Sequence, residues 1–143
     1  MSADPAARVA RFRALHRAAG AFVMPNPWDA GSARALAGLG FLALATSSGA
    51  SAGVLGRRDG QVSRDEALAH ARLIVQSTAL PVSADLEAGF GDDPDTVSQS
   101  LALAGETGLA GASIEDASGD PSHPIFDFPL AVERIAAAAE AVR

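Results

Sequence analysis

Two carboxylates set two positions apart, Asp85 and Glu87, are the feature of the sequence with the clearest chemistry. They follow an apolar segment, residues 80–84, and a spacing of two puts both side chains on the same side of extended backbone. Two negative charges this close repel each other unless a cation or a proton lies between them. Carboxylate and water oxygens are the ligands that Mg²⁺ prefers. The pair therefore predicts a site for a hard divalent cation, with two solvated acids beside a turn as the alternative.

Further candidate residues follow other apolar segments. Glu115 comes directly after the next predicted strand and could supply a third carboxylate, directly or through water. Ser48, Gly49 and Ala50 could offer hydroxyl and backbone N–H donors to a carboxylate or a phosphonate. Asp59 lies in a glycine-containing loop, where an exposed turn acid is the alternative to a role beside the site.

The elements that must position these residues alternate along the chain. Periodicity and capping residues predict helices over residues 6–19, 30–37, 63–77, from 93 or 95 to 108, and 129–143. Short apolar runs predict strands over residues 21–24, 41–45, 80–84 and 110–114, and residues 46–51 are predicted to form a polar loop. Four strand–helix units in succession predict a parallel sheet with helices outside it. Because the carboxyl ends of parallel strands lie along one edge, the polar residues after them are expected to form a single site.

The amino-acid composition excludes several classes of function. The chain has 143 residues, no cysteine and no lysine, and its 11 arginines against 17 acidic residues give a net charge of −6. Without cysteine there is no disulfide framework, thiolate nucleophile or zinc ribbon, and without lysine there is no Schiff base or Walker-type phosphate loop. The acidic charge argues against a nucleic-acid partner, and no apolar run approaches the ~20 residues that span a bilayer. We therefore expect one domain, residues 1–143, located in the cytoplasm.

In combination, these motifs resemble the isocitrate lyase / phosphoenolpyruvate mutase superfamily along nearly the whole chain. The segments that carry the resemblance are Asn26-Pro27-Trp28-Asp29-Ala30-Gly31-Ser32-Ala33-Arg34, Ser48-Gly49-Ala50, Asp59-Gly60, Pro81-Val82-Ser83-Ala84-Asp85-Leu86-Glu87-Ala88-Gly89-Phe90-Gly91 and Ile114-Glu115-Asp116. The resemblance implies a (β/α)8 TIM barrel, here truncated to about its first four βα units, in an intact protein that forms homo-oligomers. It also implies Mg²⁺, with Mn²⁺ as an alternative, and a 2-oxo acid or related carboxylate that reacts through an enolate as a C–C or P–C bond is cleaved or formed.

Carried over residue by residue, the resemblance gives each candidate residue a role. Asp85 matches the principal metal ligand, and Glu87 and Glu115 match acids around the metal. Asp59 matches an acid near the reacting centre, so Asp59 and Glu115 are the predicted catalytic residues. The predicted substrate-binding residues are those of the loop that grips the substrate, Ser48, Gly49 and Ala50.

One departure from the family pattern bears on the reaction. Members that cleave isocitrate or methylisocitrate carry a cysteine in a Lys-Cys-Gly-His segment, but here residues 116–123 contain neither lysine nor cysteine. We therefore expect a lyase or mutase of the bacterial phosphonomutase- or methylisocitrate lyase-like branch rather than a true isocitrate lyase. As the N-terminal half of a barrel, which needs about 250 residues, the chain alone is expected to be inactive. The alternative is a non-catalytic fragment or a small α/β binding module.

Overall fold

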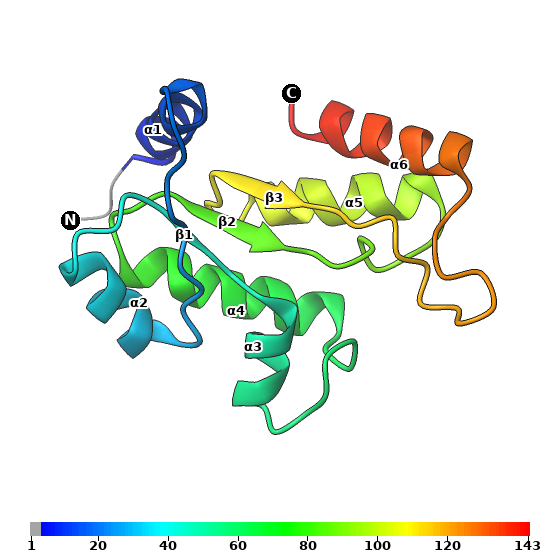
Figure 1. Cartoon of the computed structure of the whole chain (residues 1–143), viewed down its shortest axis with the longest axis horizontal. Helices are drawn as coiled ribbons and strands as arrows, with labels where there is room; N and C mark the ends of the chain where they lie inside the picture. Colours follow the sequence, from blue (N-terminus) through cyan, green and yellow to red (C-terminus); the bar gives the residue numbers. More distant parts are fainter. Residues whose placement is uncertain (1–3) are drawn as a thin grey trace.

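In the part of the chain that the structure describes, three short parallel strands form a central sheet (Figure 1). The structure, a computed structural model, describes residues 4–143, so residues 1–3 of the expected domain lie outside it. The strands are β1 (Leu44–Ala45), β2 (Val82–Asp85) and β3 (Gly111–Ser113), and they lie side by side in chain order. Leu44 pairs with Val82, and Ser83 pairs with Gly111. Parallel neighbours require crossover connections, which helices provide here.

Within residues 4–143 six helices flank this sheet: α1 (Pro5–Arg17), α2 (Ala30–Gly38), α3 (Ser48–Val54), α4 (Arg64–Ser77), α5 (Pro94–Gly105) and α6 (Phe128–Ala141). Five of them begin at a residue whose side chain accepts a hydrogen bond from a backbone N–H of the first turn, and these N-caps are Asp4, Asp29, Ser47, Ser63 and Asp93. Contacts run from α2 to α4, from α4 to α5 and from α5 to α6, so these helices pack in sequence around the sheet. Between residues 4 and 143, no helix has both the length and the hydropathy needed to cross a membrane.

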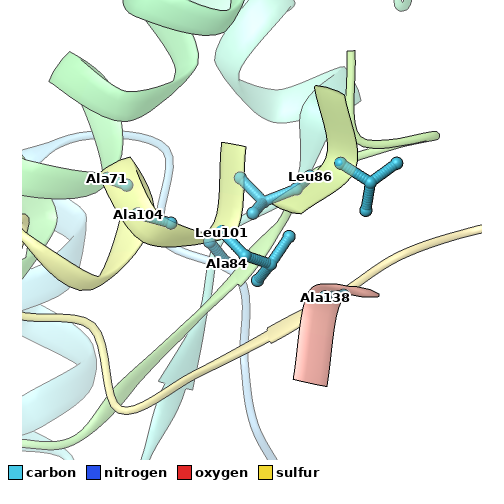
Figure 2. Packing of buried hydrophobic residues seen from close by; sticks show 7 residues of the cluster. Ala71, Ala84, Leu86, Leu101, Ala104 and Ala138 are labelled. Atoms are coloured by element: carbon cyan, nitrogen blue, oxygen red, sulfur yellow. The ribbon is translucent and has the colours of Figure 1, made fainter. Parts of the chain in front are cut away.

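Buried and half-buried side chains alternate along β2, which places the core and the candidate site on opposite faces of this strand. Val82, Ala84 and Leu86 are almost fully buried, whereas Ser83 and Asp85 between them are only half-buried. Figure 2 shows Ala84 and Leu86 beside side chains of α4, α5 and α6, namely Ala71, Leu101, Ala104 and Ala138. Burying the even-numbered side chains under the helices leaves Asp85 on the opposite face of the strand.

Three expectations about the elements are wrong. Residues 21–24 do not form a strand: the backbone hydrogen bond between this region and β1 runs from Ala45 N–H to Pro25 O at 3.2 Å, beyond residue 24, and the prolines at 25 and 27 have no N–H with which to extend it. The described part of the chain therefore has three strands rather than four. The strand expected over residues 41–45 is paired only at Leu44–Ala45. The expected loop over residues 46–51 contains the start of α3, because Ser47 caps it by accepting from Ala50 N–H.

Candidate functional site

Asp85 ends β2, and hydrogen bonds fix its carboxylate and its backbone. Its Oδ2 accepts from Ser48 N–H and its Oδ1 from Glu87 N–H, both with N···O distances of 3.0 Å. Its own N–H donates to Thr46 Oγ1 at 3.1 Å. Thr46 is buried and extends the pairing of β1, since its N–H donates to Ser83 O at 2.9 Å. The carboxyl ends of β1 and β2 therefore meet at Asp85.

Glu87 lies two residues beyond β2, at the point where the third strand also ends. Its backbone carbonyl accepts from Glu115 N–H at 2.8 Å, which ties the segment after β3 to it. Burial raises the pKa of the Glu87 carboxyl, and the negative charges of Asp59, Asp85 and Glu115 raise this pKa further. The carboxylates of Asp59, Asp85 and Glu115 therefore lie close enough to Glu87 for their charges to act on it at this edge of the sheet.

Asp59 reaches this edge from the loop between α3 and α4. A Cβ placed on Gly49 would lie 3.4 Å from Asp59 Oδ2, so the carboxylate rests against the first turn of α3. Arg57 holds the loop by donating to both carboxylate oxygens of Glu66, at 2.9 and 2.8 Å, and its backbone N–H donates to Ala52 O at 2.9 Å. Asp59 is itself exposed. The loop thus delivers a solvent-accessible acid to the edge that Asp85 and Glu87 share.

The predicted substrate-binding residues form the first turn of a helix instead of an open loop. Ser48 donates its N–H to Asp85, and Ala50 donates its N–H to the N-cap Ser47 at 3.3 Å. Gly49 lies between them, against Asp59. The turn is therefore placed beside the carboxylates, as expected, but two of its three N–H groups already have partners within the chain.

Two residues that the sequence analysis did not single out also shape the site. Thr46 orients the backbone of Asp85 through its hydroxyl, and its position directly after an apolar strand was the available signal. Arg134, from α6, donates to three backbone carbonyls of the loop after β2. Nothing local in the sequence indicated this contact, because the partners lie 42 to 46 residues earlier in the chain.

The donors at this edge suit a magnesium ion held mainly through water. Within residues 4–143, no three histidine, cysteine or acidic side chains are gathered tightly enough to enclose a metal ion. Mg²⁺ keeps several waters and is commonly bound by one or two carboxylates together with oxygens of the substrate. Asp85 and Glu87 supply such oxygens, and a cation beside them would relieve the repulsion that raises the pKa of Glu87. The residues present therefore fit Mg²⁺.

The fold and this edge define an α/β protein whose acids and amide donors gather at the carboxyl ends of parallel strands, where such sheets build their ligand sites. The sequence profile of the family described as phosphoenolpyruvate phosphomutase matches residues 12–143. The chain therefore belongs to this family, within the phosphoenolpyruvate mutase/isocitrate lyase superfamily. Superfamily members include named lyases and mutases, so the family is one of enzymes.

Individual relatives cover the chain almost completely. Uncharacterised proteins from two Mycobacterium tuberculosis strains, CDC 1551 / Oshkosh and H37Rv, are 34% identical over 130 residues, which is 88% of this chain and 46% of theirs. The crystal structure of a provisionally named lyase/mutase from Burkholderia cenocepacia J2315 is 52% identical with a TM-score of 0.94, covering 96% of this chain and 50% of that one. A 2,3-dimethylmalate lyase is 31% identical with a TM-score of 0.83, covering 94% of this chain and 47% of that one. A phosphonopyruvate hydrolase crystallised with oxalate and Mg²⁺ shares the fold at 20% identity and a TM-score of 0.89. The chain spans about half the length of these relatives.

Proposed function

We propose that this chain provides the metal- and substrate-binding part of a Mg²⁺-dependent lyase or mutase that acts on a 2-oxo acid or a phosphonate-like carboxylate. The observation that carries the proposal is the convergence of three carboxylates, those of Asp59, Asp85 and Glu115, on Glu87, at the edge where Ser48 N–H binds Asp85. The dimethylmalate lyase at 31% identity supports a small carboxylate as the substrate class.

In this proposal Asp85 and Glu87 would hold Mg²⁺, or Mn²⁺ in its place. The bound cation would polarise the oxo group of the substrate and stabilise the negative charge of an enolate-type intermediate. Ser48, Gly49 and Ala50 would orient the substrate carboxylate from the first turn of α3, with the Ser48 hydroxyl as one donor. The catalytic acids would be Asp59, which rests against Gly49, and Glu115, which is exposed after β3.

The absence of cysteine argues against isocitrate cleavage by the route of the cysteine-bearing lyases. Residues 116–123 offer no thiol, and their side chains engage one another instead: Ser118 Oγ donates to the His123 carbonyl, and Asp120 accepts from Ser122 N–H at 2.8 Å. The chemistry is therefore proposed to depend on the carboxylates. The phosphonomutase- or methylisocitrate lyase-like branch is the expected place of this chain within the family.

We further propose that residues 1–143 are one domain corresponding to the N-terminal half of a (β/α)8 barrel. Two observations support this: the chain spans about half of its relatives, and β3 is an edge strand with exposed apolar residues beyond it. Phe128 is 81% exposed, and Val132 and Ile135 are each 50% exposed on the same helix. In an intact cytoplasmic enzyme a second half of the barrel would cover this surface, and the whole would form the homo-oligomer typical of the family.

Oxalate provides a direct test, because it resembles the carboxylate end of a 2-oxo acid and cannot react further. Calorimetric titration of oxalate into the folded chain should give binding with 5 mM Mg²⁺ present and none after chelation with EDTA. Circular dichroism on the same samples controls for folding. Oxalate binding that ignores Mg²⁺ would contradict the proposed metal role. If oxalate does not bind to the folded chain, with or without Mg²⁺, a non-catalytic fragment or a binding module is favoured.

A further inference from the structure

The loop after β2 has an unusual backbone. Glu87 has a φ of +50° and Phe90 a φ of +65°, and Gly89 between them has a φ of +76°. Residues with a Cβ are strained in this left-handed region, and such conformations persist only when the surrounding structure holds them. Glu87, the residue proposed to hold a cation together with Asp85, is one of the strained positions. Something must therefore hold the loop.

Arg134 provides much of that support. Its side chain is buried, with the whole residue 1% exposed. Nη1 donates to Gly91 O and Asp92 O, each at 2.6 Å, and Nη2 donates to Ala88 O. The guanidinium carbon lies 4.0 Å from the centre of the Phe126 ring. A planar guanidinium can bind several carbonyls at once, which an ammonium group cannot do with the same geometry.

The remaining loop contacts connect this support to the carboxylates. Gly89 O accepts from Ser100 Oγ at 2.8 Å, and Gly89 N–H donates to Leu86 O at 2.8 Å. Glu87 itself contacts the candidate site through its backbone: its N–H donates to Asp85 Oδ1, and its carbonyl accepts from Glu115 N–H. The carbonyl next along the chain, that of Ala88, is bound by Arg134. Glu87 is thus fixed on one side by the candidate site and on the other by Arg134.

We propose that Arg134 is a positioning residue: it holds the loop of residues 88–92 so that the Glu87 carboxylate is directed to the edge it shares with Asp85. The expected effect on metal affinity rests on the proposed function. The positioning of the loop by Arg134 does not. The proposal predicts that removing the guanidinium disorders the loop and weakens cation binding while the sheet stays folded.

Arg8 offers a matched control. It is the other buried arginine of the described residues, 6% exposed, and it too binds a backbone carbonyl, donating to Thr78 O at 2.7 Å. Thr78 precedes β2, so Arg8 lies at the amino end of the sheet, away from the carboxylates. Arg8→Met should therefore lower the melting temperature without changing metal affinity. Arg134→Met likewise removes a buried guanidinium, but one at the other end of the sheet that binds three carbonyls instead of one.

The experiment compares the parent chain with Arg134→Met, Arg134→Lys and Arg8→Met. Mn²⁺ affinity is measured by calorimetry, and hydrogen exchange of single amides by NMR. For Arg134→Met we expect at least tenfold weaker Mn²⁺ binding and at least tenfold faster exchange of the Glu87 and Gly89 amides. The Ala110 amide, which donates to Val82 O at the other end of β2, should exchange at the parent rate. Arg134→Lys should fold and recover part of both losses.

Two results would overturn the inference. One is parent-like exchange at Glu87 and Gly89 in Arg134→Met, or in Arg134→Lys if the methionine variant does not fold. The other is an Arg134→Met variant that loses stability as Arg8→Met does but binds Mn²⁺ as tightly as the parent. If the parent itself binds no Mn²⁺, the proposed function fails, and the exchange rates alone still decide whether Arg134 positions the loop.

Discussion

Asp85 has both carboxylate oxygens engaged by backbone N–H groups, those of Ser48 and Glu87. Its direction is therefore set by the chain before any ligand arrives. Each carboxylate oxygen has a second lone pair, so these bonds leave room for a metal ion. Glu87 differs, because it is half-buried among other acids and its pKa is raised. The two acids should therefore respond differently to substitution.

Asp85→Asn should abolish Mg²⁺ binding, because it removes the charged oxygen from a site with few ligands while keeping the shape of the side chain. Glu87→Gln should weaken binding by roughly 10- to 100-fold, as expected for an acid that acts through metal-bound water. Calorimetric titration with Mg²⁺ measures both. Asp29→Ala is the control: it removes the N-cap of α2, where Asp29 Oδ1 accepts from Ser32 N–H at 2.7 Å, and should lower stability but not affinity. Parent-like affinity in Asp85→Asn would contradict the assignment.

The ion pair between Arg57 and Glu66 predicts a defined pH dependence. The Arg57 guanidinium lowers the pKa of the Glu66 carboxyl to about 2, helped by hydrogen bonds from Ser63. A folded-state pKa below the usual 4.5 stabilises the fold above pH 4.5, and this contribution is lost as the pH falls towards 2. Glu66→Gln should therefore be less stable than the parent at pH 6, and the difference should shrink by pH 2.5. Urea unfolding at both pH values measures it, with the exposed Glu133→Gln as the control expected to show no such convergence.

At the scale of elements, the helices were predictable because their starts carry local signals. Asp29 and Ser63 cap α2 and α4 as the sequence indicated, and Asp93, one of two candidates, caps α5. The strands were less predictable: two of the three paired segments are only two or three residues long, and residues 21–24 are not paired as a strand. The shared edge of Asp85, Glu87 and Glu115 followed from parallel topology. The role of Arg134 could not be predicted, because a contact with partners more than 40 residues away leaves no local pattern in the sequence.

Two glycines, one in the loop before α5 and one at its last residue, test how tightly the chain packs there. A Cβ on Gly91 would lie 2.3 Å from Thr96 Cγ2 and 2.8 Å from Thr96 Cβ, so Gly91→Ala should lower the free energy of unfolding by about 1–3 kcal/mol. A Cβ on Gly105, the last residue of α5, meets nothing within 4 Å, and Gly105→Ala should stabilise by about 0.4–1 kcal/mol. Urea unfolding curves measure both. Equal effects of the two changes would show that Thr96 can move aside.

At the scale of the whole molecule, the sheet is open beyond β3. Exposed apolar side chains cluster on the neighbouring segments, including Ile125 at 58% and Phe128 at 81%. Apolar patches of this kind, together with an unpaired strand edge, favour association with other chains. In the proposed intact barrel they would be covered by the second half.

The chain alone should therefore self-associate. Sedimentation velocity over about 5–200 μM should show the average mass rising with concentration. Phe128→Ser combined with Ile135→Ser should reduce this, because both side chains are removed from the exposed face of α6. Leu73→Ser is the control: Leu73 is 46% exposed and belongs to α4, not to the segments that follow β3. A monomer at every concentration would count against the half-barrel proposal.

The link from Arg134 to the loop after β2 also bears on how the molecule is made. Synthesis proceeds from the N-terminus, so Asp92 leaves the ribosome 42 residues before the guanidinium that binds its carbonyl. Until α6 has been translated and has folded against α5, the nascent chain can form the sheet but lacks the donors for three loop carbonyls. The support of the candidate site is therefore completed only after α6, although most of its acids are translated earlier.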